Sequence, residues 1–177
     1  MATPVLVVAQ YQEPSWQVDP LLGFEVQRVV KDLDVPNEGR ETASFFWWMW
    51  QNRHVVDPDT TYTFLQGDPW VHGILPRNFR PVSRYTPLGT YRVECAWDGS
   101  PHHPGLPLER LWWKWQIADE RPPTLKFVSG GQFMIPGSEI LKRDAGHYYW
   151  MYQQQREEEL APWCMERFWP SYWKAVA

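Results

Sequence analysis

Short apolar runs alternate with helical patterns along the chain, and this order is typical of an α/β domain. Val5–Gln10 is a continuous apolar run, as expected for a central parallel strand that is buried on both faces. Residues 24–30 and 61–65 give two further strand patterns. Between them, residues 42–52 carry aromatic side chains on nearly every side, which predicts a buried helix capped by Asn37 or Gly39.

The second half of the chain opens with a long irregular stretch. Residues 73–107 are rich in Pro, Gly and Arg, which predicts loops around one alternating strand at residues 91–97. An amphipathic helix follows, because apolar side chains recur at helical spacing at Leu108, Leu111, Trp112 and Trp115. Residues 126–128 and 132–135 then predict two short strands joined by a Gly-Gly turn.

Two helices are expected at the C-terminal end. Ser138 is in position to cap a helix that runs to about residue 158. Pro162 suits the first turn of a final helix, and Pro170 is expected to end or kink that helix. These elements together predict one compact α/β domain with a mixed, mostly parallel sheet flanked by helices.

Composition and charge narrow the classes of function. The length of 177 residues suits a single domain, and no repeat or linker divides it. The net charge of −4 argues against strong non-specific binding of nucleic acid. A local basic strip is still predicted across the loop region, formed by Arg77, Arg80, Arg84 and Arg92. The thirteen tryptophans indicate an aromatic core, with a few left to line a pocket and stack on sugar rings or bases.

Cysteine usage and apolar run length bear on the cellular location. Cys95 and Cys164 are expected to be reduced, buried thiols of an intracellular protein, and a disulfide between them stays open. No apolar run approaches the roughly 18 residues of a membrane-spanning helix, and the first residues lack a basic leader. We therefore expect a monomer of the cytoplasm, or of the host cytoplasm if the protein is viral, with no membrane partner.

The first candidate site is the segment after the third strand pattern, residues 66–72. Asp68 and His72 lie four residues apart on a loop, and together they suit a divalent cation such as Mn²⁺ or Mg²⁺. The alternative is structural, since Gly-Asp-Pro is a common turn sequence in which Asp68 caps the turn. Signatures of P-loop, dinucleotide-binding, α/β-hydrolase and zincin enzymes are absent from the chain.

Three more segments carry candidate chemistry. Arg40 suits a phosphate or carboxylate, and Glu41 either pairs with it or binds a ribose hydroxyl. His102 and His103 lie in a rigid Pro- and Gly-rich loop, where lining a pocket is favoured over metal binding. Glu166 is a carboxylate among aromatic residues, which suits a general base; the alternative is a buried ion pair with Arg167.

Six blocks in this order resemble one known family. They are residues 7–16, 36–42, 63–72, 99–107, 130–133 and 166–170, and they span nearly the whole chain. Their content is similar to that of a family known as DUF3431, a domain of unknown function, which in turn resembles the GT-A glycosyltransferases. The resemblance implies a single GT-A-like domain, with a nucleotide-binding half at residues 1–72 and an acceptor half at residues 73–177.

The resemblance also implies roles for particular residues. A nucleotide-sugar donor, such as a UDP-sugar, would contact Tyr11, Glu13, Asn37, Gly39, Arg40, Glu41, Gln66 and Gly67. Glu166 and Asp68 would be catalytic, and Asp68 with His72 would hold the metal. Gln66 stands where the first acid of the Asp-x-Asp pattern of GT-A enzymes is expected, which puts metal dependence in question. The acceptor would meet Trp70, His102, His103, Gln132 and Arg167.

The leading hypothesis is therefore a nucleotide-sugar-dependent glycosyltransferase. A hydroxymethylated pyrimidine in viral DNA is a candidate acceptor, because small stand-alone transferases of this kind occur among viruses that modify their DNA bases. Two alternatives stay open. One is a metal-dependent hydrolase of phosphate or sugar substrates built on Asp68, His72, His102 and His103; the other is a non-catalytic module that binds carbohydrate or nucleic acid.

Overall fold

The computed structural model describes residues 4–12, 24–74 and 76–174, and within them the side chains of Val71, His72 and Pro76 are excepted. The strands are β1 (Val5–Gln10), β2 (Glu25–Val30), β3 (Thr61–Gln66), β4 (Thr86–Leu88), β5 (Arg92–Cys95), β6 (Leu125–Val128) and β7 (Gln132–Pro136). The α-helices are α1 (Arg40–Asn52), α2 (Leu108–Lys114), α3 (Gly137–Leu141), α4 (Ala145–Glu157) and α5 (Ala161–Lys174). Short 3₁₀ turns occupy Arg53–Val55, Pro69–His72 and Pro76–Asn78.

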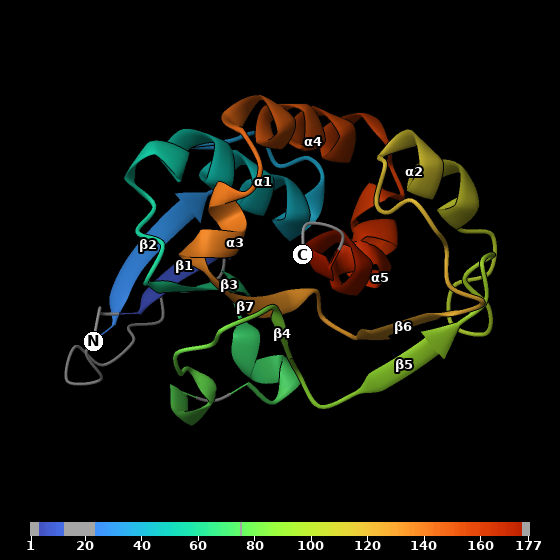
Figure 1. Cartoon of the computed structure of the whole chain (residues 1–177), viewed down its shortest axis with the longest axis horizontal. Helices are drawn as coiled ribbons and strands as arrows, with labels where there is room; N and C mark the ends of the chain where they lie inside the picture. The colour runs from blue at the N-terminus through green and yellow to red at the C-terminus, as the bar shows by residue number, and fades with distance from the viewer. Residues whose placement is uncertain (1–3, 13–23, 75, 175–177) are drawn as a thin grey trace.

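The main sheet is mixed and has the order β2-β1-β3-β7-β4. Strands β2, β1 and β3 are parallel, whereas β7 is antiparallel to both β3 and β4. The expected α/β class with a mixed sheet flanked by helices is confirmed (Figure 1). Strands β2 and β3 lie on opposite sides of β1, so the order in which strands are added to the sheet reverses between β1 and β3. Ligands of open α/β sheets bind at the carboxyl ends of the strands at such a point.

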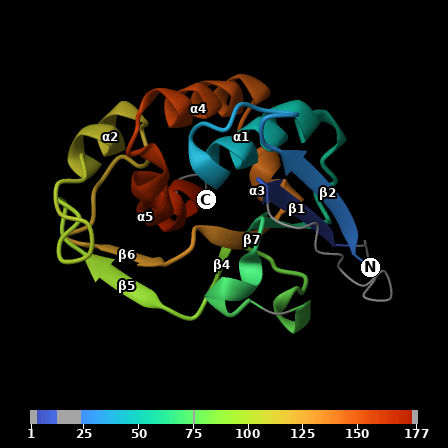
Figure 2. The ribbon, with the colours of Figure 1, turned by 180° about the vertical axis from the view of Figure 1, so that it is seen from behind.

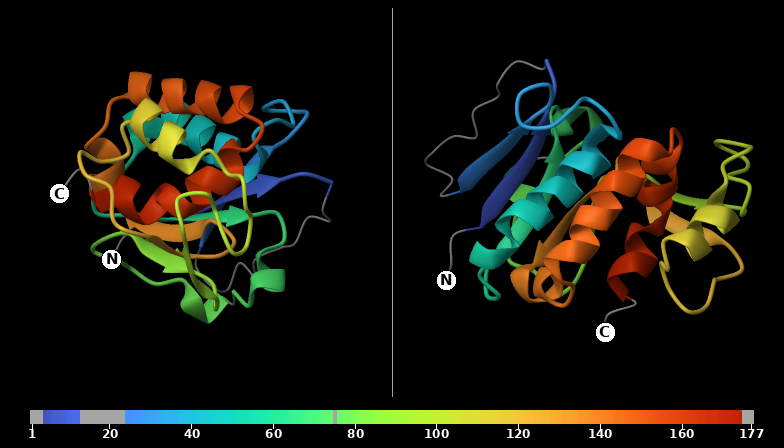
Figure 3. Two further views of the ribbon diagram at one scale, coloured as in Figure 1. Left: turned by 90° about the vertical axis from the view of Figure 1, so that its right-hand side faces the viewer. Right: turned by 90° about the horizontal axis from the view of Figure 1, so that it is seen from above.

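Helices α1 and α4 cover one face of the sheet, side by side, and α5 lies beside them (Figures 1 and 3). The aromatic side chains of the sequence fill this interface. Phe45 of α1 contacts Phe64 and Phe133 edge-on at 5.3 and 6.0 Å between ring centroids. The tryptophans Trp48, Trp112, Trp115, Trp169 and Trp173 are all buried, as expected for an aromatic core.

The opposite face of the sheet has a smaller cover. The loop between β3 and β4 runs beneath the strands (Figure 2). It brings Ile74 and Phe79 against Leu6, Leu65 and Met134. This second cluster buries the other sides of β1 and β3, which explains the continuous apolar run at Val5–Gln10.

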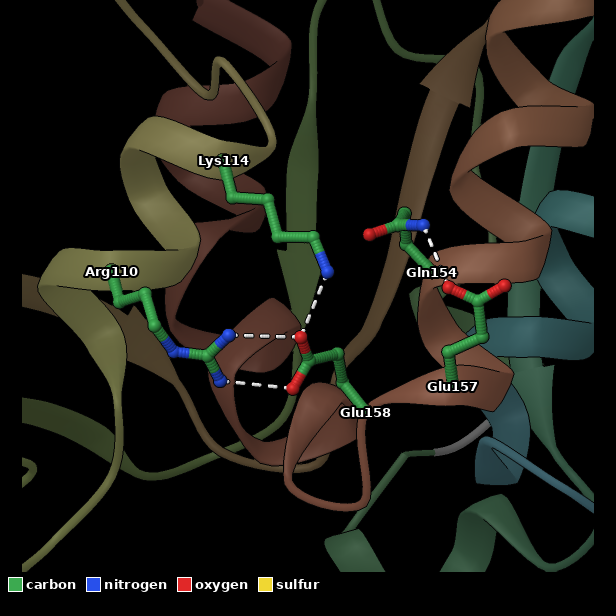
Figure 4. A network of polar contacts seen from close by, with 5 residues as sticks. All are labelled: Arg110, Lys114, Gln154, Glu157 and Glu158. Atoms are coloured by element: carbon green, nitrogen blue, oxygen red, sulfur yellow. Dashed lines mark hydrogen bonds and ion pairs between the residues drawn. The ribbon is translucent and has the colours of Figure 1, made fainter.

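A two-stranded ribbon, β5 with β6, extends from the sheet toward α2 and packs against α5 (Figures 1 and 3). Helix α2 is tied to the end of α4 by Glu158, whose carboxylate accepts two hydrogen bonds from Arg110 and one from Lys114 (Figure 4). These bonds lower the pKa of Glu158 to about 2. Helix α2 and the far end of the ribbon lie on the opposite side of the molecule from β2 (Figure 1).

One expectation about helices needs correction. The helix expected from Ser138 to residue 158 is broken into α3 and α4; Ser138 lies inside α3, and the cap of α4 is Asp144, whose side chain accepts from the His147 backbone N–H. Pro170, expected to end or kink the last helix, lies inside α5 and does not end it. Gly39, one of the two expected caps of α1, is its N-cap, with φ of 66°.

Cys95 and Cys164 are free and buried, as expected for reduced thiols. None of the helices formed by the described residues combines the length and the apolar character needed to cross a membrane. The two parts of the chain assigned to donor and acceptor share one sheet, since β7 from the second part inserts beside β3 of the first.

Candidate functional site

A cavity of about 300 Å³ opens at the carboxyl end of β3, beside the first turn of α1 and the β6–β7 turn. Segments far apart in the sequence meet there. Seven residues singled out from the sequence line it: Arg40, Glu41, Gln66, His102, His103, Glu166 and Arg167. Val93, Phe127, Ser129, Gly130, Pro162 and Trp163 complete the lining.

Glu166 supplies the buried carboxylate of this cavity from the middle of α5. Its side chain is 18% exposed, and its Oε1 accepts a hydrogen bond from the backbone N–H of Gly130. Burial raises the pKa of Glu166 above its ordinary value, while the Gly130 bond and the charge of Arg167 act in the opposite direction. A carboxylate that is costly to leave charged binds a proton readily, as a general base must.

Arg167 lies behind Glu166 and is only 1% exposed. Its guanidinium donates to the carbonyl oxygen of Trp163 at 2.6 Å and contacts Nδ1 of His103 at 2.9 Å. Glu166 Oε2 lies 3.3 Å from the same guanidinium, so the ion pair considered from the sequence is present. Loss of solvation, with the nearby Arg167 charge, lowers the pKa of His103. His103 is thus held as a neutral acceptor toward Arg167.

Arg167 retains donor capacity that the surrounding protein does not use. Its Nε is buried and has no hydrogen-bond partner among the described residues. A buried, unpaired donor is costly, but this nitrogen has almost no accessible surface and is closed to the cavity. Arg40, which lines the cavity and is exposed, is a cation that a ligand can reach.

Arg40 and Glu41 reach the cavity from the start of α1. Arg40 has 57% of its side chain exposed, stacks over the Trp163 ring at 4.9 Å and lies 3.7 Å from Glu41. The left-handed conformation of Gly39 turns the chain into the helix at this point. The positive end of the helix dipole and the guanidinium of Arg40 therefore act on the same side of the cavity.

Gly131 lies where the two acidic side chains and α5 meet. It has φ of 63°, and a Cβ built there would be in van der Waals contact with Glu41 Oε1 at 3.8 Å, Glu166 Cγ at 3.9 Å and Trp169 Nε1 at 3.9 Å. The indole N–H of Trp169 is buried and has no partner among the described residues. The β6–β7 turn therefore brings Glu41 and Glu166 to one place.

Gln66 and Gln132 join the cavity to the sheet. Gln132 Oε1 accepts from the Gln66 backbone N–H at 3.2 Å, and Gln66 Nε2 donates to the carbonyl oxygen of Asp68 at 2.9 Å. Gln132 Nε2 is buried and lacks a partner among the described residues. Gln66 thus holds the backbone of Asp68, a structural task that its amide performs and an acid there does not.

The described side chains do not support the predicted metal site at Asp68 and His72. Over residues 4–12, 24–74 and 76–174, no group of three or more His, Cys, Asp or Glu side chains stands where it would hold a metal ion. Asp68 does not line the cavity, and the side chain of His72 lies outside the described part. The Asp68–His72 site therefore stays a prediction, and the donor set that is described does not form a protein-built metal site.

Other residues chosen from the sequence surround the cavity or fall outside the described part. Gly67, Asp68 and Trp70 follow β3, and Tyr11 follows β1, the neighbour of β3 in the sheet, in which Ala9 pairs with Gln66. Asn37 is exposed and its backbone N–H donates to Asp32. None of these residues, nor Gly39 or Gln132, lines the cavity. Glu13 lies outside the described residues.

Some lining residues were not singled out from the sequence. Val93 and Phe127 face each other across the β5–β6 ribbon, and Ser129 begins its turn toward β7. The alternation of the two strands was the available signal, because it puts Val93 and Phe127 on one face. It did not indicate which face meets the cavity, since that depends on how α5 packs.

Comparisons of the chain with protein-family models, with curated proteins and with solved structures found no match. What the site can do follows from its own groups. It combines the mostly buried carboxylate of Glu166, the exposed guanidinium of Arg40 at a helix N-terminus and the buried guanidinium of Arg167 in one cavity. These groups suit the transfer of a proton next to a bound anion.

Proposed function

We propose that the protein is a glycosyltransferase that moves a sugar from a nucleotide-sugar donor, such as a UDP-sugar, to an acceptor hydroxyl. One observation carries the proposal: the buried carboxylate of Glu166 shares a small cavity with Arg40 at the N-terminus of α1. Glycosyl transfer needs a base for the acceptor hydroxyl and positive charge for the leaving diphosphate. The resemblance to GT-A glycosyltransferases in six ordered blocks supports the same assignment.

Glu166 acts as the base in this proposal. As the acceptor oxygen forms its bond to the anomeric carbon of the sugar, Glu166 takes the hydroxyl proton. The bond between that carbon and the diphosphate oxygen breaks, and the nucleoside diphosphate leaves with the electron pair. The raised pKa of Glu166 suits this task, because proton transfer is most effective when the pKa of the base lies nearer the working pH.

Arg40 stabilises the charge that the leaving diphosphate gains. Its guanidinium is exposed and, among the described residues, contacts Trp163 and Glu41, so it is able to turn toward a phosphate oxygen. The first turn of α1 adds its backbone N–H groups and dipole. Arg167, buried in the wall behind, adds its positive charge.

The rest of the donor has a place beside the cavity. The carboxyl ends of β1 and β3 adjoin, and Tyr11 follows the first of them while Gln66 ends the second. In this proposal the sugar and the diphosphate occupy the cavity of about 300 Å³. The nucleobase of the donor lies outside it, over the carboxyl end of β1. Asp68 offers one carboxylate near this point, and no step of the proposed reaction passes through a metal.

The alternatives receive less support. A hydrolase built on Asp68, His102 and His103 needs these groups together, whereas the two histidines line the cavity and Asp68 does not. A purely binding module has no use for a carboxylate with a raised pKa next to unpaired donors. A hydroxymethylated pyrimidine in DNA as acceptor, the cytoplasmic location and the monomeric state stay predictions.

A donor panel tests the proposal. The purified protein is incubated with nucleotide sugars that differ in base and in sugar, with and without Mn²⁺, and nucleoside diphosphate release is measured. We expect one donor to be bound and slowly hydrolysed, with faster release when a suitable hydroxyl acceptor is present. Absence of both binding and release for every donor contradicts the proposal.

A further inference from the structure

A second and larger cavity, of about 790 Å³, lies between the C-terminal half of α5 and the β5–β6 ribbon. Its apolar wall is made by Tyr85, Pro87, Val93, Phe127, Val128, Pro170 and Trp173. Its charged rim is made by Arg84, Arg92, Glu94, Lys126, Glu139 and Lys174. Of these residues, Pro170 belongs to the last of the six blocks, and Arg84 and Arg92 belong to the expected basic strip.

This cavity adjoins the cavity of Glu166. Val93 and Phe127, which pair across the ribbon, line both of them. Helix α5 runs along both, with Glu166 facing the first and Pro170 and Trp173 facing the second. Tyr85, in the wall of the second cavity, is close enough to Glu166 for the carboxylate charge to raise its pKa, although burial contributes more. A molecule in the second cavity therefore has a short path to the base.

The rim of the second cavity has an excess of unpaired positive charge. Glu94 forms a salt bridge with Lys126 at 3.6 Å, and Glu139 forms one with Lys142 at 3.0 Å. Arg84, Arg92 and Lys174 form no salt bridge with any residue that the structure describes, and all three are exposed. Three cations without counter-charge around an apolar wall favour an anionic ligand with an apolar body.

We propose that the second cavity is the acceptor site and that the acceptor carries a phosphate group, which Arg84 and Arg92 bind. The inference rests on the proposed function, because it names the acceptor class for the reaction at Glu166. The acceptor's phosphate lies at the rim, its apolar part lies on Val93 and Phe127, and its hydroxyl reaches Glu166 past this pair. Phosphate recognition by guanidinium groups is strong because two parallel N–H donors match two oxygens.

The four arginines of the expected basic strip divide between two pockets, and this division provides a control. Arg84 and Arg92 line the second cavity, whereas Arg77 and Arg80 line a separate pocket of about 240 Å³. The two pockets share Pro87 alone. Removing either pair of arginines changes the net charge by the same amount. A difference in ligand affinity between the two double variants therefore reflects the position of the arginines and not their charge.

Equilibrium binding without any donor tests the proposal. Thymidine 5′-monophosphate, a four-residue oligothymidylate and glucose 6-phosphate are titrated by calorimetry, beside thymidine and glucose as phosphate-free counterparts. We expect at least one phosphate probe to bind about tenfold or more tightly than its counterpart, since each charged hydrogen bond is worth about 1.5–3 kcal/mol. Which probe binds distinguishes a free nucleotide, a strand and a sugar phosphate as the source of the phosphate.

The double variant Arg84→Ala/Arg92→Ala should weaken that binding by about tenfold or more, whereas Arg77→Ala/Arg80→Ala should leave it unchanged. The proposal is overturned if no phosphate probe binds, if the phosphate-free counterpart binds equally well, or if both double variants lose affinity to the same extent. These readouts need no turnover. A failure of the transferase proposal would instead appear as missing donor chemistry with phosphate binding at Arg84 and Arg92 intact.

Discussion

Glu166 and Arg167 are neighbours in the sequence, yet they serve the cavity in different ways. Glu166 lines the cavity, and Arg167 is buried behind it, bonded to Trp163 and His103. The sequence offered a general base and a structural ion pair as alternatives; the ion pair is present, and the role of general base stays a prediction. Sequence spacing did not separate them, because the outcome depends on contacts with the loop of His103, more than 60 positions away.

Arg40 and Arg121 make a matched pair for testing the role of Arg40. Each is exposed, stacks on a tryptophan ring at 4.9 or 5.1 Å and pairs with a glutamate, but only Arg40 lines the cavity. Arg40→Ala should weaken nucleoside diphosphate binding by about tenfold, the value of one charge-assisted hydrogen bond. Calorimetric titration measures this.

Arg121→Ala should bind nucleoside diphosphate as the unmodified protein does. Equal affinities for the two variants and the unmodified protein would remove Arg40 from the donor site. Equal losses in both variants would point to the stacked arginine as a feature of stability rather than of binding.

At the scale of elements, the sequence predicted most of the strands, but it predicted the helix boundaries less well. Val5–Gln10 was identified because a doubly buried strand needs a continuous apolar run. The short strand β4 was missed, because it lies in the Pro- and Gly-rich stretch that predicted loops. The break between α3 and α4 was also missed: Ser138 lies inside α3, and Asp144 caps a new helix. Pro170 is tolerated inside α5, although proline usually ends a helix.

The approach of α1 to α4 depends on Gly39. A Cβ at this position would stand 2.6 Å from the backbone oxygen of Gln155, so Gly39→Ala has to push the two helices apart. Gly105 also has positive φ, but a Cβ there meets nothing within 4 Å. Gly105→Ala therefore shows the backbone strain alone, about 1 kcal/mol.

Gly39→Ala should lower the free energy of unfolding by about 1–3 kcal/mol more than Gly105→Ala does, because overpacking is added to strain. Urea unfolding of both variants measures the difference. A similar loss in the two variants would show that α1 and α4 are not held as closely as the structure has them.

His147 links α4 to α5 and gives the fold a dependence on pH. Its ring stacks on Tyr172, its Nε2 lies 2.8 Å from the Tyr172 hydroxyl, and burial, followed by the charge of Arg143, lowers its pKa from 6.5 to about 4. Between these values the unfolded state binds more protons than the folded state. The free energy of unfolding should therefore fall as the pH is lowered from 6.5 to 4. Below pH 4 this group should cause no further decrease.

The variant His147→Phe keeps a ring in this place and removes the titrating group. Each pKa unit is worth about 1.4 kcal/mol. Between pH 6.5 and pH 4, the free energy of unfolding of His147→Phe should therefore fall by up to roughly 3 kcal/mol less than that of the unmodified protein. Thermal or urea unfolding at several pH values measures it. His54→Phe, at an exposed position, is the control; an unchanged slope in His147→Phe would contradict the assignment.

At the scale of the whole molecule, blocks scattered from Arg40 to Arg167 converge on one cavity. The sequence predicted that polar residues gather at the carboxyl ends of β1 and β3, and Gln66 does line the cavity. It did not indicate that one wall of the cavity is the β5–β6 ribbon, which packs against α5. That arrangement is set by long-range packing between the ribbon and α5, which local patterns do not encode.

We propose above all that Glu166 is the general base of a sugar transfer in the cavity that it shares with Arg40. The most direct test is the rate of nucleoside diphosphate release from the best donor and acceptor, compared between the unmodified protein and Glu166→Gln. Gln keeps the size and the acceptor for the Gly130 N–H, so donor binding should be preserved while the rate falls by about 10²- to 10⁴-fold. Glu159→Gln, at an exposed position, should react normally. A Glu166→Gln variant that releases diphosphate at the rate of the unmodified protein would contradict the claim.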